Sequence, residues 1–316
     1  MIKVDRLTKR YGSFKAVESV RFEVGRGEIV GLLGPNGAGK TTTMRMLTTY
    51  LSPTSGRASL AGHDVLDEPL EVRRKVGYLP ENVPLYPEMR VIEYLRHRAR
   101  LKDVPRPDRR RAIAEVVSRC QLGEVERRII GQLSRGFRQR VGLAESMLHD
   151  PEILILDEPT AGLDPLQIRE VRDLIRELGE RHTILLSTHI LSEVEAVCGR
   201  VIIIARGRIA LDDQLANLHR QSAIVLEARG SADVIKAALQ TIPGVERVVV
   251  SRREGDYGWF EVHTRREEDL REAISQKLVT NGWPLRQLDL RRSSLEERFT
   301  QAVTRDTLAD AQIEAD

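Results

Sequence analysis

Short apolar runs alternate with longer stretches of helical periodicity between residue 1 and about residue 220. The short runs predict buried strands, and the longer stretches repeat their apolar residues every three or four positions, as amphipathic helices do. Strands that alternate with helices predict an α/β domain with a mainly parallel central sheet. The predicted core strands are residues 29–33, 76–79, 153–157, 183–187 and 201–205.

Two parts of this domain break the alternation. Residues 1–27 and 57–66 contain β-prone runs interrupted by glycine, which predict an antiparallel β subdomain. Residues from about 84 to 150 are helical in pattern and predict an inserted helical subdomain. Its expected helices are residues 91–102, 108–121 and 137–149.

The pattern changes again beyond residue 220, where the elements follow in the order β-α-β-β-α-β. That order predicts a ferredoxin-like accessory domain over residues 221–303, which would end in a helix at 294–303. The acidic segment 304–316 predicts a flexible tail. The six elements of the accessory domain are expected at 223–229, 232–242, 246–253, 257–264, 268–279 and 285–292.

The composition is that of a globular protein of two or three domains, with 316 residues of which 41% are hydrophobic and 31% charged. A net charge of +3 is too balanced to indicate nucleic acid, and we expect no nucleic-acid partner. Many arginines lie between residues 90 and 128. They predict solvated helix faces or, alternatively, a surface that docks near lipid head groups or an acidic partner.

The chain carries no signal for export and no membrane-spanning run. Its N-terminus lacks an apolar segment, and its longest apolar runs fall well short of the roughly 20 residues that cross a bilayer. Cys120 and Cys198 stand far apart without metal-type spacing, which fits a reducing compartment. These features predict a cytoplasmic location.

The most specific local pattern lies directly after the first core strand, where residues 34–41 read GPNGAGKT and a helical pattern follows. This is G-x-x-x-x-G-K-[ST] between a strand and a helix, the pattern of a phosphate-binding P-loop. Its glycines let successive N–H groups face one anion, while Lys40 is expected to reach the β- and γ-phosphates and Thr41 to ligate Mg²⁺. The predicted cofactors are therefore ATP and Mg²⁺. The predicted nucleotide ligands are Gly34, Pro35, Asn36, Gly37, Ala38, Gly39, Lys40, Thr41 and Thr42.

Polar side chains also follow other strands. Asp157 and Glu158 end the strand at 153–157, at the sheet edge where open α/β sheets bind ligands. We expect Asp157 to hold Mg²⁺ and Glu158 to orient or deprotonate the attacking water, as catalytic residue. His189, after a further apolar strand, is either structural or a catalytic sensor of the γ-phosphate. Tyr11 either stacks on an adenine ring or packs across two strands.

A second candidate anion site lies at residues 132–145, QLSRGFRQRVGLAE, where Ser134 and Gly136 precede a helical pattern. With the P-loop, ILILDEPTAGLD and STH, this segment resembles the ATP-binding cassette (ABC) ATPases in order and spacing over about residues 1–220. The resemblance implies a P-loop fold with a RecA-like core. It also implies ATP hydrolysis by a nucleotide-binding subunit.

The resemblance further implies a head-to-tail dimer, expected as a homodimer, that sandwiches two ATP molecules. Ser134 and Gly136 of one subunit would then contact the γ-phosphate bound by the other, and Asp164 would lie in the loop that crosses the interface. Ordinary helix N-caps are the alternative for Ser134 and Asp164, because both residues precede predicted helices.

Two residues depart from the family pattern. Arg135 interrupts the usual Ser-Gly-Gly-Gln signature and adds a cation near the phosphates. An arginine would also make a left-handed backbone conformation less favourable at this position than a glycine does. Glu81 stands where the family commonly has a glutamine that touches Mg²⁺ and water. A carboxylate can ligate Mg²⁺ but adds negative charge near the phosphates, which predicts a sharper dependence on Mg²⁺.

The segments GYLPEN and GFRQRVGLAE and the accessory module look most like the ATPase subunits of drug, lipid and polysaccharide exporters, including the gliding-motility and nitrous-oxide-reductase-maturation types. This implies a peripheral subunit at the inner face of the cell membrane that powers a separately encoded permease. The accessory domain could bind a small ligand, dimerise or brace the dimer, and we favour bracing.

Two other functions remain as alternatives. One is a soluble ABC ATPase that acts on ribosomes or DNA, which the single cassette and the lack of extended heptads disfavour. The other is a non-hydrolysing regulatory cassette, which the presence of Lys40, Asp157, Glu158 and His189 disfavours.

Overall fold

The computed structural model describes residues 1–219, 222–264, 269–292, 295–296 and 299–300. They divide into two compact units, Met1–Asp213 and Gln214–Thr300, so the division falls shortly before the predicted boundary at residue 220. The predicted tail at 304–316 and most of the predicted helix at 294–303 lie outside the described residues.

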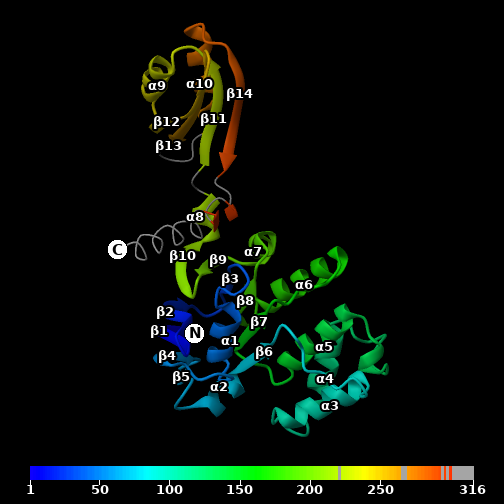
Figure 1. The fold of residues 1–316 in the computed structure, drawn as a ribbon. Coiled ribbons are helices and arrows are strands. Elements are labelled where there is room, and N and C mark those ends of the chain that lie inside the picture. The colour runs from blue at the N-terminus through cyan, green and yellow to red at the C-terminus, as the bar shows by residue number, and fades with distance from the viewer. Residues whose placement is uncertain (220–221, 265–268, 293–294, 297–298, 301–316) are drawn as a thin grey trace. The chain divides into compact units, whose positions relative to one another are not determined.

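A six-stranded sheet in the order β10-β9-β3-β8-β7-β6 forms the centre of the first unit (Figure 1). The neighbouring pairs from β9 to β6 are parallel, as predicted. All five residues of β7 are buried, which explains why this strand has a continuous apolar run and no alternation. The strands are β3 (Ile29–Leu33), β6 (Val76–Leu79), β7 (Ile153–Asp157), β8 (Thr183–Thr188), β9 (Arg200–Ala205) and β10 (Arg208–Gln214).

The predicted antiparallel β subdomain is a four-stranded sheet in the order β2-β1-β4-β5. Buried and exposed residues alternate along much of β2, because one face of this sheet packs on a core. That core includes Val4, Met44 and Ile155 and so joins both sheets to α1 (Lys40–Leu47). The strands are β1 (Ile2–Tyr11), β2 (Phe14–Val24), β4 (Ser55–Leu60) and β5 (His63–Asp64).

The helical subdomain contains three helices that pack on one another (Figure 1). They are α3 (Val91–Leu101), α4 (Arg109–Arg119) and α5 (Arg135–Met147), each within two residues of its predicted ends. Sequence patterns did not predict α2 (Pro69–Lys75), which is short and buries only Val72. The remaining helices of the first unit are α6 (Pro165–Leu178), α7 (Leu191–Val197) and the 3-10 turn η1 (Ile130–Gln132).

The second unit follows the predicted β-α-β-β-α-β order, and its antiparallel sheet has the order β12-β13-β11-β14. Apolar residues of both helices pack with the sheet in one core that includes Leu239, Phe260 and Leu278. A short helix, α8 (Leu215–His219), precedes the module. The module comprises β11 (Ser222–Arg229), α9 (Ala232–Gln240), β12 (Val245–Glu254), β13 (Tyr257–Thr264), α10 (Arg271–Thr280) and β14 (Leu285–Arg292).

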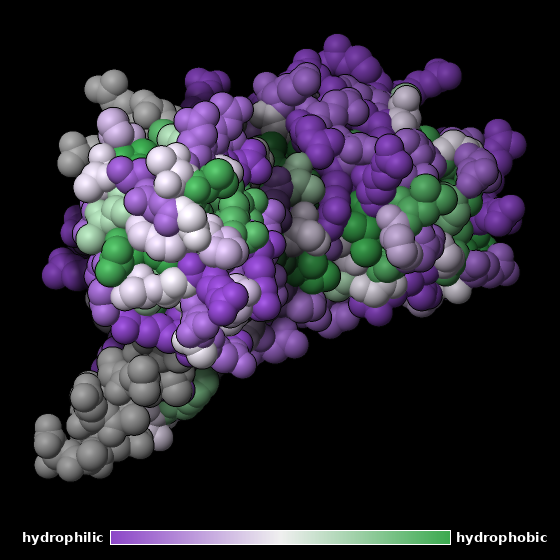
Figure 2. Space-filling model, turned by 90° about the horizontal axis from the view of Figure 1, so that it is seen from above, coloured by the Kyte–Doolittle hydropathy of each residue, from purple (hydrophilic) through white to green (hydrophobic). Residues whose placement is uncertain are grey.

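The surface in Figure 2 is mostly hydrophilic, with hydrophobic residues in separate patches between charged ones. Within the described ranges, no helix has both the length and the apolar character that a bilayer span requires.

A buried ion cluster fastens α3 to α5. Glu145 is 6% exposed, and one of its carboxylate oxygens accepts hydrogen bonds from Arg98 at 2.9 and 2.7 Å and lies 3.3 Å from Lys102 Nζ. Two cations therefore depend on one acid that is shielded from water.

We expect Glu145→Ala to lower the free energy of unfolding by about 3 kcal/mol, because it leaves Arg98 and Lys102 without their buried counter-charge. The control is Glu115→Ala, which removes ion pairs of an exposed carboxylate with Arg119 at 3.0 Å and Arg181 at 3.6 Å and should cost about 0.5 kcal/mol. Urea denaturation followed by circular dichroism measures both changes. Equal losses of unfolding free energy in the two variants would show that burial of the ion cluster adds nothing to its effect on stability.

Candidate functional site

The loop between β3 and α1 folds back on itself through two glycines with positive φ angles, Gly37 at 79° and Gly39 at 104°. A Cβ atom on Gly39 would lie 2.6 Å from the carbonyl oxygen of Ala16, so only glycine allows the loop to approach β2 this closely. The helix α1 then begins at Lys40 and directs its first N–H groups into the loop. This is the local geometry that the sequence pattern predicts for a phosphate loop.

Carbonyl groups of the loop backbone hold the Lys40 side chain in place. Its ammonium donates to the carbonyl oxygens of Gly34 at 2.8 Å and Pro35 at 3.2 Å, and it lies 3.4 Å from Glu158 Oε1. The side chain is only 6% exposed. The loop therefore presents a fixed positive charge beside its row of N–H groups.

Asp157, the last residue of β7, is fully buried. Its Oδ1 accepts hydrogen bonds from Ser187 at 2.6 Å and from Thr41 at 3.2 Å, whereas Oδ2 is buried without a partner. Burial raises the pKa of Asp157, the two hydrogen bonds oppose that rise, and the charges of Glu81 and Glu158 add to it. A buried carboxylate oxygen with no donor beside a threonine hydroxyl fits the oxygen ligands that Mg²⁺ prefers.

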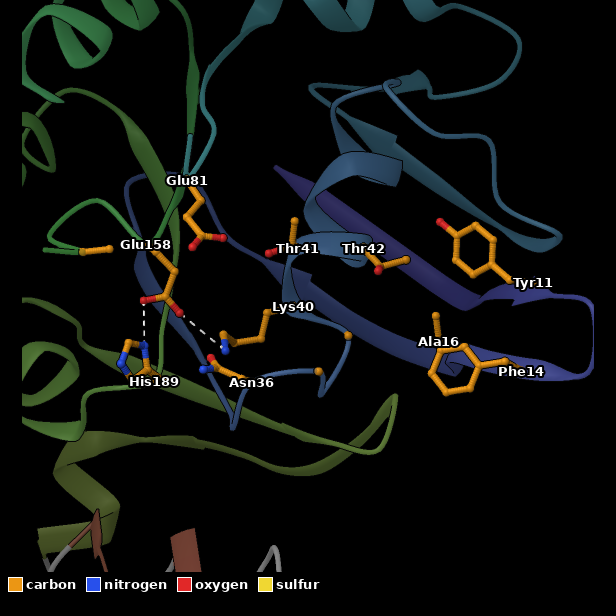
Figure 3. A pocket seen from close by; sticks show the side chains of 13 residues that line it. Tyr11, Phe14, Ala16, Asn36, Lys40, Thr41, Thr42, Glu81, Glu158 and His189 are labelled. Atoms are coloured by element: carbon orange, nitrogen blue, oxygen red, sulfur yellow. Dashed lines mark hydrogen bonds and ion pairs between the residues drawn. The ribbon is translucent and has the colours of Figure 1, made fainter. Parts of the chain in front are cut away.

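Glu158 lies between two basic side chains (Figure 3). Its Oε2 lies 2.9 Å from His189 Nδ1, and its Oε1 faces Lys40. Its φ angle is +49°, which is unusual for a residue with a side chain, and its N–H donates to Ser187 Oγ at 3.0 Å. The backbone is thus held in a conformation that turns the carboxylate into the cavity.

Lys40, Glu158 and His189 line a cavity of 460 Å³, whereas the predicted metal ligand Asp157 is not among its lining residues. At its other side lie the rings of Tyr11 and Phe14, away from Glu158 and His189 (Figure 3). The two aromatic residues are partners across the turn between β1 and β2 and are 52% and 63% exposed. The full lining is Tyr11, Phe14, Ala16, Asn36, Gly37, Gly39, Lys40, Thr41, Thr42, Glu81, Glu158, Ala161 and His189.

Sequence analysis did not single out Phe14, Ala16, Ala161 or Ser187. Phe14 could have been found, because YGSF at residues 11–14 is a hairpin turn that pairs its flanking residues. Ser187 could not, since its contact with Asp157 depends on the pairing of β8 with β7.

Several predicted residues do not line the cavity. Gly34, Pro35 and Ala38 belong to the loop but are not among the residues that line the cavity. Ser134 Oγ accepts from the N–H of Phe137 at 3.3 Å, and Asp164 Oδ1 accepts from the N–H of Gln167 at 2.9 Å. Both residues are therefore N-caps, of α5 and α6, and both are exposed to solvent.

Gly136 and Arg135 pack against the segment that contains Asp164. A side chain at Gly136 would collide with Gln167, and the Arg135 guanidinium lies against Gly162. Arg135 has no left-handed backbone, because Ser134 takes the extended N-cap conformation and α5 begins at Arg135. An arginine therefore fits this position without backbone strain.

Comparisons with known proteins identify the family of this chain. The family model of the ABC transporter matches residues 17–161. The chain is 34% identical over 304 residues to the uncharacterised ABC transporter ATP-binding protein YxlF of Bacillus subtilis, covering 96% of this chain and 99% of that protein. It is also 34% identical to the bacitracin transport ATP-binding protein BcrA of Bacillus licheniformis, covering 96% and 97% of the two chains.

A solved structure extends the likeness to the fold. The ATP-binding cassette MJ0796, in a dimeric post-hydrolysis state with ADP and Pi, superposes with a TM-score of 0.63 at 25% identity. The match covers 68% of this chain and 99% of the cassette. With the phosphate loop, the paired acids and two full-length relatives in agreement, the chain belongs to the ATP-binding subunits of ABC transporters and is an ATPase of that family.

Proposed function

We propose that two copies of this chain close head to tail around two ATP molecules and power a separately encoded membrane permease that works as an exporter. One observation carries the catalytic part of the proposal: Lys40, Glu158 and His189 meet in one cavity at the ends of β3, β7 and β8. Each of them is at hydrogen-bonding or ion-pair distance from the next. The expected substrates are ATP and water.

The cavity offers separate places for the two ends of a nucleotide. Tyr11 and Phe14 provide two exposed aromatic faces for an adenine ring, and Lys9 Nζ lies 5.4 Å from the Tyr11 ring. The phosphate loop and Lys40 lie toward the other end (Figure 3). Stacking on the aromatic pair and charge on the loop would together bind ATP lengthwise.

Asp157 and Thr41 would hold Mg²⁺, with Glu81 at the edge of the same cavity. The unpartnered Oδ2 of Asp157 supports this assignment, since a bound cation would compensate a carboxylate that is costly to bury. When bound, the cation neutralises charge on the phosphate oxygens.

Hydrolysis needs little covalent chemistry from the protein, because phosphoryl transfer depends mainly on positioning and charge. Glu158 would orient the attacking water and accept its proton, and His189 would hold the Glu158 carboxylate from the outer side. Lys40 would stabilise the charge of the γ-phosphate. No other carboxylate lines the described part of the cavity except Glu81, so Glu158 is the best candidate for the base.

A second copy of the chain gives Ser134, Gly136 and Asp164 a place in the proposed site. These residues stand at the starts of α5 and α6 and do not line the cavity of their own chain. The N-terminus of α5 could donate N–H groups to a phosphate held by a neighbour. The dimeric state of the related cassette MJ0796 supports this arrangement.

The relatives support the proposed permease partner. BcrA is named for bacitracin transport, and the similarity to it spans nearly all of this chain. Residues 84–89 after Glu81 would pass movement to the permease, because Tyr86 is 42% exposed and packs edge-on against Tyr94 of α3 at 5.9 Å. The subunit would then sit peripherally at the cytoplasmic face of the membrane.

Phe14→Ala should weaken ATP binding about tenfold, since one stacking face for the base is lost. Titration with a fluorescent ATP analogue measures the change. Tyr50→Ala is the matched control, because Tyr50 is 79% exposed and does not line the cavity. An unchanged affinity in Phe14→Ala would exclude the aromatic pair as the adenine site.

Glu158→Gln should reduce ATP turnover by about a thousandfold or more, because the amide cannot accept the proton of the attacking water. ATP binding should persist, and the variant should form an ATP-dependent dimer in size-exclusion chromatography. Glu180→Gln, an exposed position beyond α6, is the control. Rapid turnover by Glu158→Gln would refute the assignment of the base.

Glu81→Gln should make the dependence of ATPase activity on Mg²⁺ less steep, since one negative charge near the phosphates disappears. Activity measured across a Mg²⁺ titration tests this, with the exposed Glu88→Gln as the control. If both variants follow the wild-type titration, Glu81 has no part in metal binding.

A further inference from the structure

A buried acid outside the predicted site joins the two segments that carry Glu158 and His189. This is Glu193, on α7, which is 4% exposed. Its Oε1 accepts a hydrogen bond from Thr160 Oγ1 at 2.5 Å, and its Oε2 accepts one from Thr188 Oγ1 at 2.6 Å. Thr160 follows Glu158 by two positions, and Thr188 directly precedes His189.

Both threonines depend on this acid. Thr160 is 4% exposed and Thr188 is fully buried, so water does not replace a lost partner easily. The Thr188 hydroxyl also accepts the N–H of Ile190 at 3.1 Å, which orients its own O–H toward Glu193. Two short bonds to separate oxygens of one carboxylate make a rigid bridge.

This bridge complements a second tie between the same segments. The N–H of Glu158, whose φ angle is +49°, is bound by Ser187 Oγ at 3.0 Å and by the Ser187 carbonyl at 3.2 Å. Ser187 thus fixes the start of the segment after β7, at Glu158. Glu193 fixes the same segment two residues further along, at Thr160. Both ties restrain the backbone positions from which Glu158 and His189 extend.

We propose that Glu193 is a positioning residue for ATP hydrolysis: it holds the segments after β7 and at the end of β8 so that His189 keeps its 2.9 Å contact with the Glu158 carboxylate. The inference rests on the roles proposed above for Glu158 and His189. It adds a residue that contacts neither the loop nor the cavity. A displacement of the base of about 1 Å can lower a rate by roughly a hundredfold.

Glu193→Ala should therefore lower kcat about 10- to 100-fold while the Kd for ATP stays within about twofold of wild type, because the phosphate loop is untouched. Glu193→Gln should recover most of kcat, since an amide can accept from one threonine and donate to the other. Glu195→Ala, on the exposed side of α7, is the control. Steady-state ATPase assays, nucleotide titration and thermal melting are measured for every variant.

A merely structural role gives a different result. In that case kcat would fall only with the folded fraction, or Kd and kcat would worsen together, and Glu193→Gln would restore stability without restoring kcat. Any of these results would overturn the proposal. If Glu193→Ala does not fold, Thr160→Val and Thr188→Val each remove one side of the bridge, and unchanged kcat in both would overturn it equally.

A double variant separates this inference from the proposed function. If Glu193 acts through Glu158, adding Glu193→Ala to Glu158→Gln should cause no further loss of the residual rate. A further tenfold loss would show that Glu193 acts elsewhere. Rapid turnover by Glu158→Gln alone would instead contradict the proposed base. The kcat of Glu193→Ala would then still decide whether the Glu193 bridge positions groups for hydrolysis.

Discussion

The cost of burying two adjacent carboxylates at the end of one parallel strand dominates this site. Asp157 and Glu158 end β7 in a region almost closed to water, where an unpaired negative charge is unfavourable. Donors come from three elements: Lys40 and Thr41 begin α1, Ser187 lies in β8, and His189 follows β8. The loop, the sheet and the segment after β8 are thus tied to one pair of acids.

Much of this arrangement could be predicted because the signals are local. The phosphate loop is contiguous, two of its glycines have positive φ angles, and the first four residues of β7 are apolar because the whole strand is buried. The elements of the accessory domain could be predicted equally well, since all six have clear alternation or helical periodicity and end near their predicted residues. Local patterns also placed Asp157 and Glu158 at the strand end.

The contacts of Ser187 with Asp157 and of Glu193 with Thr160 could not be predicted, because each joins residues about 30 positions apart through the register of β7 and β8. Neither Ser187 nor Glu193 belongs to a pattern that identifies its partner in the sequence. The structure removes the backbone cost expected at Arg135. The predicted helix begins at residue 137, whereas the Ser134 cap starts α5 at Arg135, two positions earlier, and Arg135 has no left-handed conformation.

The contact between Lys40 and Glu158 has a consequence for the order of events in the proposed cycle. Lys40 is near one carboxylate oxygen of Glu158, and His189 is near the other. A polyphosphate on the loop carries more negative charge than one carboxylate, so it competes for Lys40 more strongly than Glu158 does. Its binding would release Oε1 of Glu158 while His189 still holds Oε2. The base would then become available to water only after the phosphates are in place, which couples catalytic readiness to nucleotide binding.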